Sequence, residues 1–267
     1  MNKLFAFMKK DLLVTLSYRF NLLLSLLGIF LSVATFYFIG RTFSGALSPF
    51  LARYGGDYFP YVLIGIAVSN FVTVGLSALS QQVRSAQVEG TLEALLTTPT
   101  SIFTVLIGNS LWSFITALGS AVVLIAAGFL VIHFEVSLVR AAAAVVVLLL
   151  TFLAFLMVGM LSASFVILFK RGDPIGYVFG WSSFLLGGIL FPVEVLPAPL
   201  PLLSRFLPIT YAIEAIRELL LVRAPLRSVL PLVLALCLFP VVLGPVSVLF
   251  FRYAVHRARK DGNLVQF

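Results

Sequence analysis

The sequence is poor in charged residues, cysteine and histidine, and these shortages limit what the chain can be. Only 10% of the 267 residues are charged and 61% are hydrophobic, whereas soluble domains carry about 25% charged and roughly 45–50% apolar residues. One water-soluble core cannot bury this excess, so lipid must be part of the solvent. The single cysteine, Cys237, excludes an intramolecular disulfide and any metal site built from clustered cysteines.

Motifs for ATP hydrolysis and for chemistry inside the membrane are also missing. A P-loop needs a lysine directly after a glycine to bind phosphate, and none of the five lysines follows a glycine. The apolar runs contain no ionisable residue for proteolysis or proton coupling. His133 and His256 are interpreted as headgroup-level residues rather than metal ligands. We therefore expect no enzyme activity, no metal and no cofactor on this chain, and the energy for any transport must come from elsewhere.

Six runs are apolar enough to form transmembrane helices, and none contains a charged residue. A spanning helix needs about 20 mostly apolar residues. We predict an all-α polytopic membrane protein with six transmembrane helices in a single domain, residues 1–267. The six runs are Leu22–Gly40, Tyr58–Ser80, Ile102–Ile132, Ala141–Phe169, the short and glycine-rich Pro174–Phe191, and Val229–Phe251.

Residues 192–227, between the fifth and sixth runs, are apolar but interrupted by proline and charge. Proline removes a backbone donor and clashes with the preceding turn, so this segment cannot be one clean span. Irregular backbone at membrane depth persists only when protein or water covers it. We predict two short helices that dip in and return as an external re-entrant hairpin. The prolines are Pro192, Pro197, Pro199, Pro201, Pro208 and Pro225.

The distribution of lysine and arginine predicts the orientation. With the N-terminus in the cytoplasm, the inside segments carry eleven basic residues and the outside segments seven, and all five lysines lie inside. Six spans then place both termini in the cytoplasm. The net charge of +8 is attributed to anionic lipid headgroups and topology rather than to nucleic acid.

Residues 1–20 precede the first run and combine apolar and basic positions. Phe5, Met8, Leu12 and Leu16 recur at helical spacing, while the lysines lie elsewhere on the helical wheel. We expect an amphipathic helix on the cytoplasmic leaflet. A solvated leader is the alternative.

Residues 81–99, between the second and third runs, form the most informative loop. Glu89 and Glu93 are four apart and share one helical face. Val88, Leu92 and Leu95 form a neighbouring apolar strip, and Pro99 closes the segment. The pattern predicts either a short helix that docks another protein or a solvated helix on the membrane surface.

Within the external segment, Glu214, Arg217 and Glu218 lie within one helical turn and can share a face. A charged side chain at membrane depth is energetically unfavourable unless it is paired or hydrated. One interpretation is an ion pair of Glu214 with Arg217 that fixes a short helix. The other is a lining of the exit, in which the same two residues orient headgroups or help to hold an external gate closed.

The motifs resemble those of ABC transporter permeases of the type-2 exporter class, in the same order and on the expected sides of the membrane. The resemblance covers nearly the whole chain, including the six-span layout. Its motifs are Glu89-Gly90-Thr91-Leu92-Glu93 with Leu95-Leu96 and Pro99, then Leu190-Phe191-Pro192, Leu196-Pro197, Leu207-Pro208-Ile209-Thr210-Tyr211-Ala212, Glu214-Ala215-Ile216-Arg217, and the tail 257–262.

The resemblance implies a permease dimer, homomeric or heteromeric, in a bacterial-type cytoplasmic (inner) membrane. Two separate ATPase subunits would bind ATP and Mg and would drive export. The cargo would be a drug, a lipid or a glycan-linked lipid. The residues implied in ATPase coupling are Arg84, Glu89, Gly90, Thr91, Leu92 and Glu93. The residues implied in the external re-entrant segment or gate are Pro192, Pro208, Tyr211, Glu214 and Arg217.

A non-catalytic membrane scaffold, or a passive channel without an ATPase, has the same composition and is the alternative function. Co-purification of a nucleotide-binding subunit separates the two. A membrane enzyme ranks third, because the sequence offers no catalytic residues.

Overall fold

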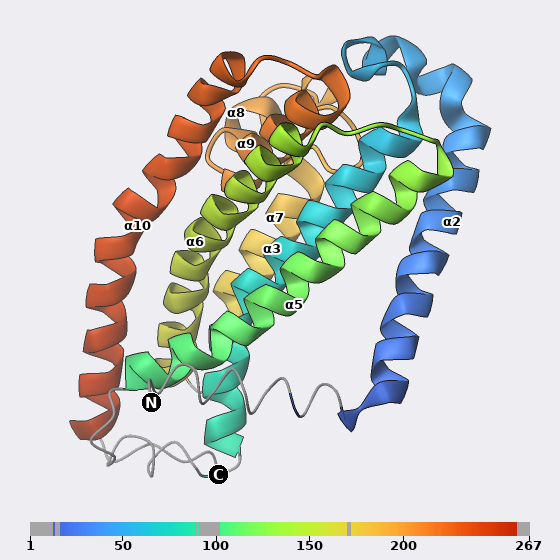
Figure 1. Ribbon diagram of the computed structural model, residues 1–267. Helices are drawn as coiled ribbons and strands as arrows, with labels where there is room; N and C mark the ends of the chain where they lie inside the picture. Colours follow the sequence, from blue (N-terminus) through green and yellow to red (C-terminus); the bar gives the residue numbers. More distant parts are fainter. Residues whose placement is uncertain (1–12, 14–16, 89, 91–101, 170–171, 261–267) are drawn as a thin grey trace.

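The computed structural model describes residues 13, 17–88, 90, 102–169 and 172–260. The remaining residues are drawn as a grey trace in Figure 1. Most of the expected interfacial helix therefore lies outside the described residues. The same holds for four of the expected coupling residues, Glu89, Thr91, Leu92 and Glu93.

Every regular element in the described part of the chain is helical. The long helices are α2 (Arg19–Leu51), α3 (Tyr58–Val88), α5 (Ile102–Val131), α6 (Leu138–Phe169) and α10 (Leu226–Lys260). The shorter elements are η1 (Ala52–Tyr54), α7 (Pro174–Leu186), η2 (Val193–Val195), α8 (Leu200–Ser204), α9 (Pro208–Arg217) and the π-helical turn η3 (Glu218–Val222).

The five long helices are long and apolar enough to cross a membrane, which makes this a multi-pass membrane protein. The sequence predicts all five near these positions. The fifth predicted run, Pro174–Phe191, forms only the 13-residue helix α7 before the chain bends at residues 187–191. At about 1.5 Å per residue, α7 is roughly 20 Å long and by itself shorter than the ~30 Å hydrocarbon core of a bilayer.

Helix α3 lies at the centre of the bundle. It packs against α2, α5, α6, α7 and α9, and Figure 1 shows it crossing behind α5. It is the most buried of the five long helices, whereas α2 and α10 lie at the periphery with most of their surface exposed. An apolar helix that is exposed on most of its surface is suited to lipid or to another protein.

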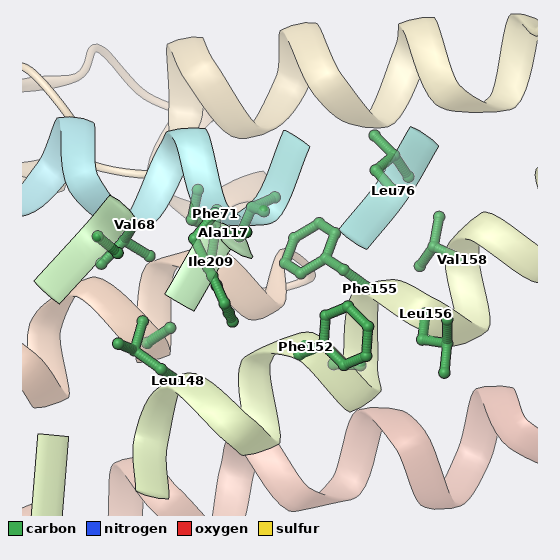
Figure 2. Close-up of a cluster of buried hydrophobic side chains, with 14 of the residues drawn as sticks. Val68, Phe71, Leu76, Ala117, Leu148, Phe152, Phe155, Leu156, Val158 and Ile209 are labelled. Carbon is green, nitrogen blue, oxygen red and sulfur yellow. The ribbon is translucent and has the colours of Figure 1, made fainter. Parts of the chain in front are cut away.

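The core between α3, α5 and α6 is built mainly from aliphatic and aromatic side chains (Figure 2). The Phe114 and Phe152 rings lie 4.3 Å apart, and Phe71 packs against both. Helix packing therefore accounts for these three phenylalanines.

Residues 192–227, for which the sequence predicts an external hairpin, contain η2, α8, α9 and η3, at the end of the bundle where α10 begins (Figure 1). Helix α9 packs against α3, α6 and α10. Its apolar face, which includes Ile209, Ile213 and Ile216, is fully buried. Protein therefore covers helix α9, whereas residues 194–199, where the backbone is irregular, are mostly exposed.

Candidate functional site

An open groove of about 480 Å³ runs between α3 and α7. One wall is polar and comes from α3, and the other is mainly aromatic and comes from α7. Because the two helices run in opposite directions, the start of α7 faces the end of α3 (Figure 1). The lining residues are Ser69, Thr73, Leu76, Ser77, Ser80, Gln81, Arg84, Val166, Asp173, Gly176, Tyr177, Gly180, Trp181 and Phe184.

The polar wall is a stripe along one face of α3. Ser69, Thr73, Ser77, Gln81 and their neighbours recur at intervals of three to four residues, which is the helical repeat. The Thr73 hydroxyl donates to the Ser69 carbonyl at 2.9 Å, and the Ser77 hydroxyl donates to the Thr73 carbonyl at 2.8 Å. These donors are satisfied within the helix, so the hydroxyl oxygens can accept hydrogen bonds from a molecule in the groove.

The aromatic wall belongs to α7, whose start is fixed by a side-chain cap. Asp173 accepts a hydrogen bond from the Gly176 amide at 2.7 Å, and Pro174 occupies the first helical position. Tyr177 and Trp181, at 68% and 70% exposure, follow at helical spacing on the groove side. Neither ring is covered by the rest of the chain.

Arg84, which the sequence analysis assigns to ATPase coupling, lies on the last turns of α3 and lines the end of the groove. Residues 81–88, expected in the cytoplasmic loop, continue α3 without a break. Gly90 follows at a positive φ of 68°, a conformation that suits glycine and ends a helix. The rest of the coupling segment predicted for residues 81–99, including Glu89 and Glu93, stays a prediction, because Glu89 and residues 91–99 lie outside the described part.

At the opposite end of α3 an ion cluster joins η1 to the external segment. Arg53 donates to Glu214 Oε1 at 3.0 Å and also to Glu218 Oε1. The predicted ion pair of Glu214 with Arg217 is therefore wrong, because Glu214 pairs with Arg53. Glu214 and Glu218, four residues apart, share the face that meets Arg53, whereas Arg217 points into the protein.

Arg217 is buried, at 3% exposure, and is bound by backbone carbonyls. It donates to Tyr61 O at 2.9 Å, to Gly188 O at 2.7 Å and to Ile189 O at 3.0 Å. Its guanidinium also lies over the Tyr61 ring, 3.4 Å from the centroid. The side chain thus ties α9 to α3 and to the bend after α7, and it faces neither lipid nor open solvent.

Burial raises the pKa of Glu214 above its usual value. Arg53 opposes this shift, while the nearby carboxylates of Glu194 and Glu218 add to it. The ion pair with Arg53 therefore only partly offsets the loss of water around the Glu214 carboxylate.

The other external residues singled out by the sequence have structural contacts. Pro192 is buried and precedes η2, and Pro208 occupies the first turn of α9. The Tyr211 hydroxyl donates to Arg205 O at 2.9 Å, and its ring packs against Phe239 of α10. These contacts hold the hairpin in place, and a role in a gate is not tested by them.

Sequence reasoning missed the polar stripe on α3, the aromatic wall of α7 and the role of Arg53. The stripe could have been found from the sequence, because Ser69, Thr73 and Ser77 repeat every four residues inside an apolar run. The partner of Arg53 could not, because it lies more than 160 residues away along the chain. Among the described residues, no group of three or more histidines, cysteines or acidic residues could hold a metal ion.

Comparison with known protein families identifies the family of this chain. The model of the family described as ABC-2 type transporter matches residues 3–221, which is most of the chain. No curated protein matches the chain significantly.

Proposed function

This chain belongs to the ABC-2 type transporter family, and on that premise we propose that it is the transmembrane permease subunit of an ATP-driven exporter. It would act with a second permease chain, identical or different, and with two separate ATP-binding subunits that hold ATP and Mg. The single observation that carries the proposal within this chain is the groove between α3 and α7.

The groove supports a transport path because of its composition. Hydroxyl groups and Arg84 on α3 face exposed aromatic rings on α7, although both helices belong to an apolar bundle. A polar stripe open to lipid is unfavourable, so a second chain, cargo or water must cover it. A groove open on one side in each of two subunits would form one enclosed path between them.

Six crossings are favoured by the course of the chain. Helices α6 and α10 run in the same direction (Figure 1), so the chain must return to the other side of the bundle between residues 169 and 226. Helix α7 makes this return, and the bend at residues 187–191 completes it. We propose that this is the sixth crossing, with α8 and α9 as the external re-entrant hairpin.

Helix α3 is suited to transmit movement from one end of the bundle to the other. Its C-terminal end leads into the proposed coupling loop, and its first turns carry Tyr61, which Arg217 binds. The groove lies between these points. Movement of the ATPase subunits would push the loop, displace α3 and change the groove and the external hairpin together.

The test is whether an ATPase binds and responds. The full chain is purified from membranes of cells that express it with candidate nucleotide-binding subunits, and Mg-dependent ATP hydrolysis and cargo export in vesicles are measured. We expect a stable complex. The double variant Glu89→Lys with Glu93→Lys should lower coupled hydrolysis or assembly while membrane insertion stays normal. Exposed ion pairs contribute only about 0–1 kcal/mol each, so the two changes are combined.

Glu135→Lys is the matched control, because Glu135 is exposed and lies between α5 and α6, away from the proposed docking loop. It should leave assembly and hydrolysis unchanged. A passive channel or scaffold predicts that no ATPase co-purifies under any of these conditions. Normal binding and transport by the double variant would reject the docking role of Glu89 and Glu93.

A further inference from the structure

Arg84, at the end of the groove, is a cation without a partner among the described residues. Its side chain is exposed, and no described residue forms an ion pair or hydrogen bond with it. The acidic residue that shares the groove, Asp173, caps α7 through the Gly176 amide and, within the part of the chain that the structure describes, forms no ion pair with Arg84.

The remainder of the groove carries hydroxyl and apolar surface along its whole length, and no second cation among the described residues lines it. From Arg84 to Ser69 the wall of α3 extends over fifteen residues, or about 22 Å. The hydroxyls of α3 share this wall with Leu76, and Trp181 and Phe184 supply apolar surface opposite. One leaflet of hydrocarbon is roughly 15 Å deep, half of the ~30 Å core. A molecule with a headgroup at Arg84 and an apolar portion beside the aromatic wall therefore fits a groove of this length.

We propose that the groove binds a membrane amphiphile with an anionic headgroup, taken from the leaflet at the C-terminal end of α3, with Arg84 binding the headgroup. A guanidinium offers several donors to a phosphate or carboxylate. A zwitterionic headgroup gains less, because its own cation offsets the attraction between its phosphate and Arg84. The proposal rests on the proposed function, since it names the substrate class of the same groove.

Binding can be measured without any ATPase, because one of the two tryptophans lines the groove. Trp181 is in the groove wall, whereas Trp112 lies on α5, outside it. The Trp112→Phe protein is placed in lipid nanodiscs that contain equal mole fractions of brominated phosphatidylglycerol or brominated phosphatidylcholine. We expect the anionic lipid to quench Trp181 about three- to fivefold more effectively, the size of effect expected from one partly exposed charge contact.

The controls separate a site from general attraction to a basic surface. Arg84→Gln should bring the ratio between the two lipids close to one, whereas Arg252→Gln, on the exposed surface of α10, should leave it unchanged. In the Trp181→Phe protein, Trp112 should show no headgroup preference. Equal quenching by both lipids in the parent, or equal loss of preference in Arg84→Gln and Arg252→Gln, would overturn the proposal.

The result is independent of the transport test. A groove that selects the anionic lipid in a chain that binds no ATPase would refute the exporter while retaining the site. An ATPase complex that exports cargo but shows no headgroup preference would refute the anionic substrate while retaining the exporter.

Discussion

Arg217 is a charged residue in a buried and closely constrained environment. Three backbone carbonyls from two separate segments surround its guanidinium, and the Tyr61 ring covers one face. Only a planar group with several donors satisfies this arrangement. The nearby chain is equally constrained, because an added Cβ at Gly65 would lie 2.3 Å from Ile189 O and 2.9 Å from the Arg217 guanidinium.

We therefore expect Arg217→Lys to destabilise the protein although the charge is retained. A lysine ammonium cannot reach all three carbonyls, and losing buried hydrogen bonds of a charged group costs about 2–3 kcal/mol. Thermal unfolding of the purified protein in detergent measures the effect. Arg205→Lys, at an exposed arginine in the same segment, is the control and should leave the unfolding temperature unchanged. Equal stability of the two variants would mean that the carbonyl contacts of Arg217 contribute little.

Glu214 leads to a prediction about pH, because burial raises its pKa in the folded protein. In the unfolded chain the carboxyl has a pKa of about 4.3. The folded state therefore favours the protonated carboxyl, and this contribution to stability is fully present below that value and is lost as pH rises through the raised pKa. Glu214→Gln removes the titration and keeps an oxygen that can accept from Arg53.

The Glu214→Gln protein should thus become more stable relative to the parent as pH rises from about 4 to 8. Unfolding curves of the two proteins, recorded in parallel at each pH, measure the difference. Arg53→Ala should instead destabilise the protein at neutral pH, because it leaves the Glu214 and Glu218 carboxylates close together without their cation. If the parent instead becomes more stable than Glu214→Gln as pH rises, the attraction to Arg53 outweighs the cost of burying the Glu214 carboxylate.

The sequence identified Glu214 and Arg217 as important but not their partners. Helical spacing shows which side chains can share a face, and it allows Glu214 to meet either Arg217 or Glu218. The actual partner of Glu214 is Arg53, which lies in η1. Exchanging Glu214 and Arg217 would place a carboxylate among three carbonyl oxygens, so we expect the exchanged protein to be destabilised although both charges are kept.

At the scale of the helices, the contact between α3 and α6 depends on small residues. An added Cβ at Gly159 would lie 2.8 Å from Leu76 O and 3.0 Å from Gly75 O. The two backbones therefore approach closely, as small residues permit in membrane bundles. The neighbouring core, with Phe152 and Phe155 against Gly75, forms around this contact.

We expect Gly159→Ala to destabilise the protein by about 1–3 kcal/mol, the usual effect of overpacking a well-packed core. Gly119→Ala is the matched control, since Gly119 lies within α5 and has no atom within 4 Å of an added Cβ. That change should be neutral or stabilising by up to about 1 kcal/mol, because alanine is the better helix former. Unfolding in detergent compares the two, and equal effects would mean that α6 can move away from α3.

The long helices could be predicted from the sequence because hydrophobic length alone decides them. The limits of α3 could not. Its last turns carry Gln81 and Arg84, which lower the apolar content, yet the helix continues because Val83 and Ala86 pack against the core. Helix α7 ends before its apolar run does, because the backbone turns at two glycines. Gly188 adopts a positive φ of 75°, and Gly187 has no room for a side chain beside Ser183 O and Ile209.

At the scale of the whole molecule, the number of crossings depends on α7. If α7 and the bend after it cross the membrane, α10 begins on the same side as the loop between α5 and α6. If they do not cross, α10 begins on the side where α6 ends. The parallel course of α6 and α10 in Figure 1 favours the first arrangement. The lysine and arginine distribution predicts that the α5–α6 loop lies outside.

Single cysteines in a Cys237→Ser background test this arrangement with a thiol reagent that does not cross the membrane. Val88, at the end of α3, is 67% exposed and is a better site than Gln87, which is buried. Ser137→Cys reports the α5–α6 loop and Ser228→Cys the start of α10, and both positions are exposed.

In intact cells we expect Ser137→Cys and Ser228→Cys to react and Val88→Cys to react only after the membrane is opened. Ser228→Cys is decisive, because its position relative to Ser137 depends only on whether residues 170–225 cross. Protection of Ser228→Cys together with reaction of Ser137→Cys would give five crossings and would place the C-terminal end of α10 outside. Reaction of Val88→Cys alone in intact cells would reverse the orientation while leaving six crossings intact, since Ser137 and Ser228 would then share the inner side.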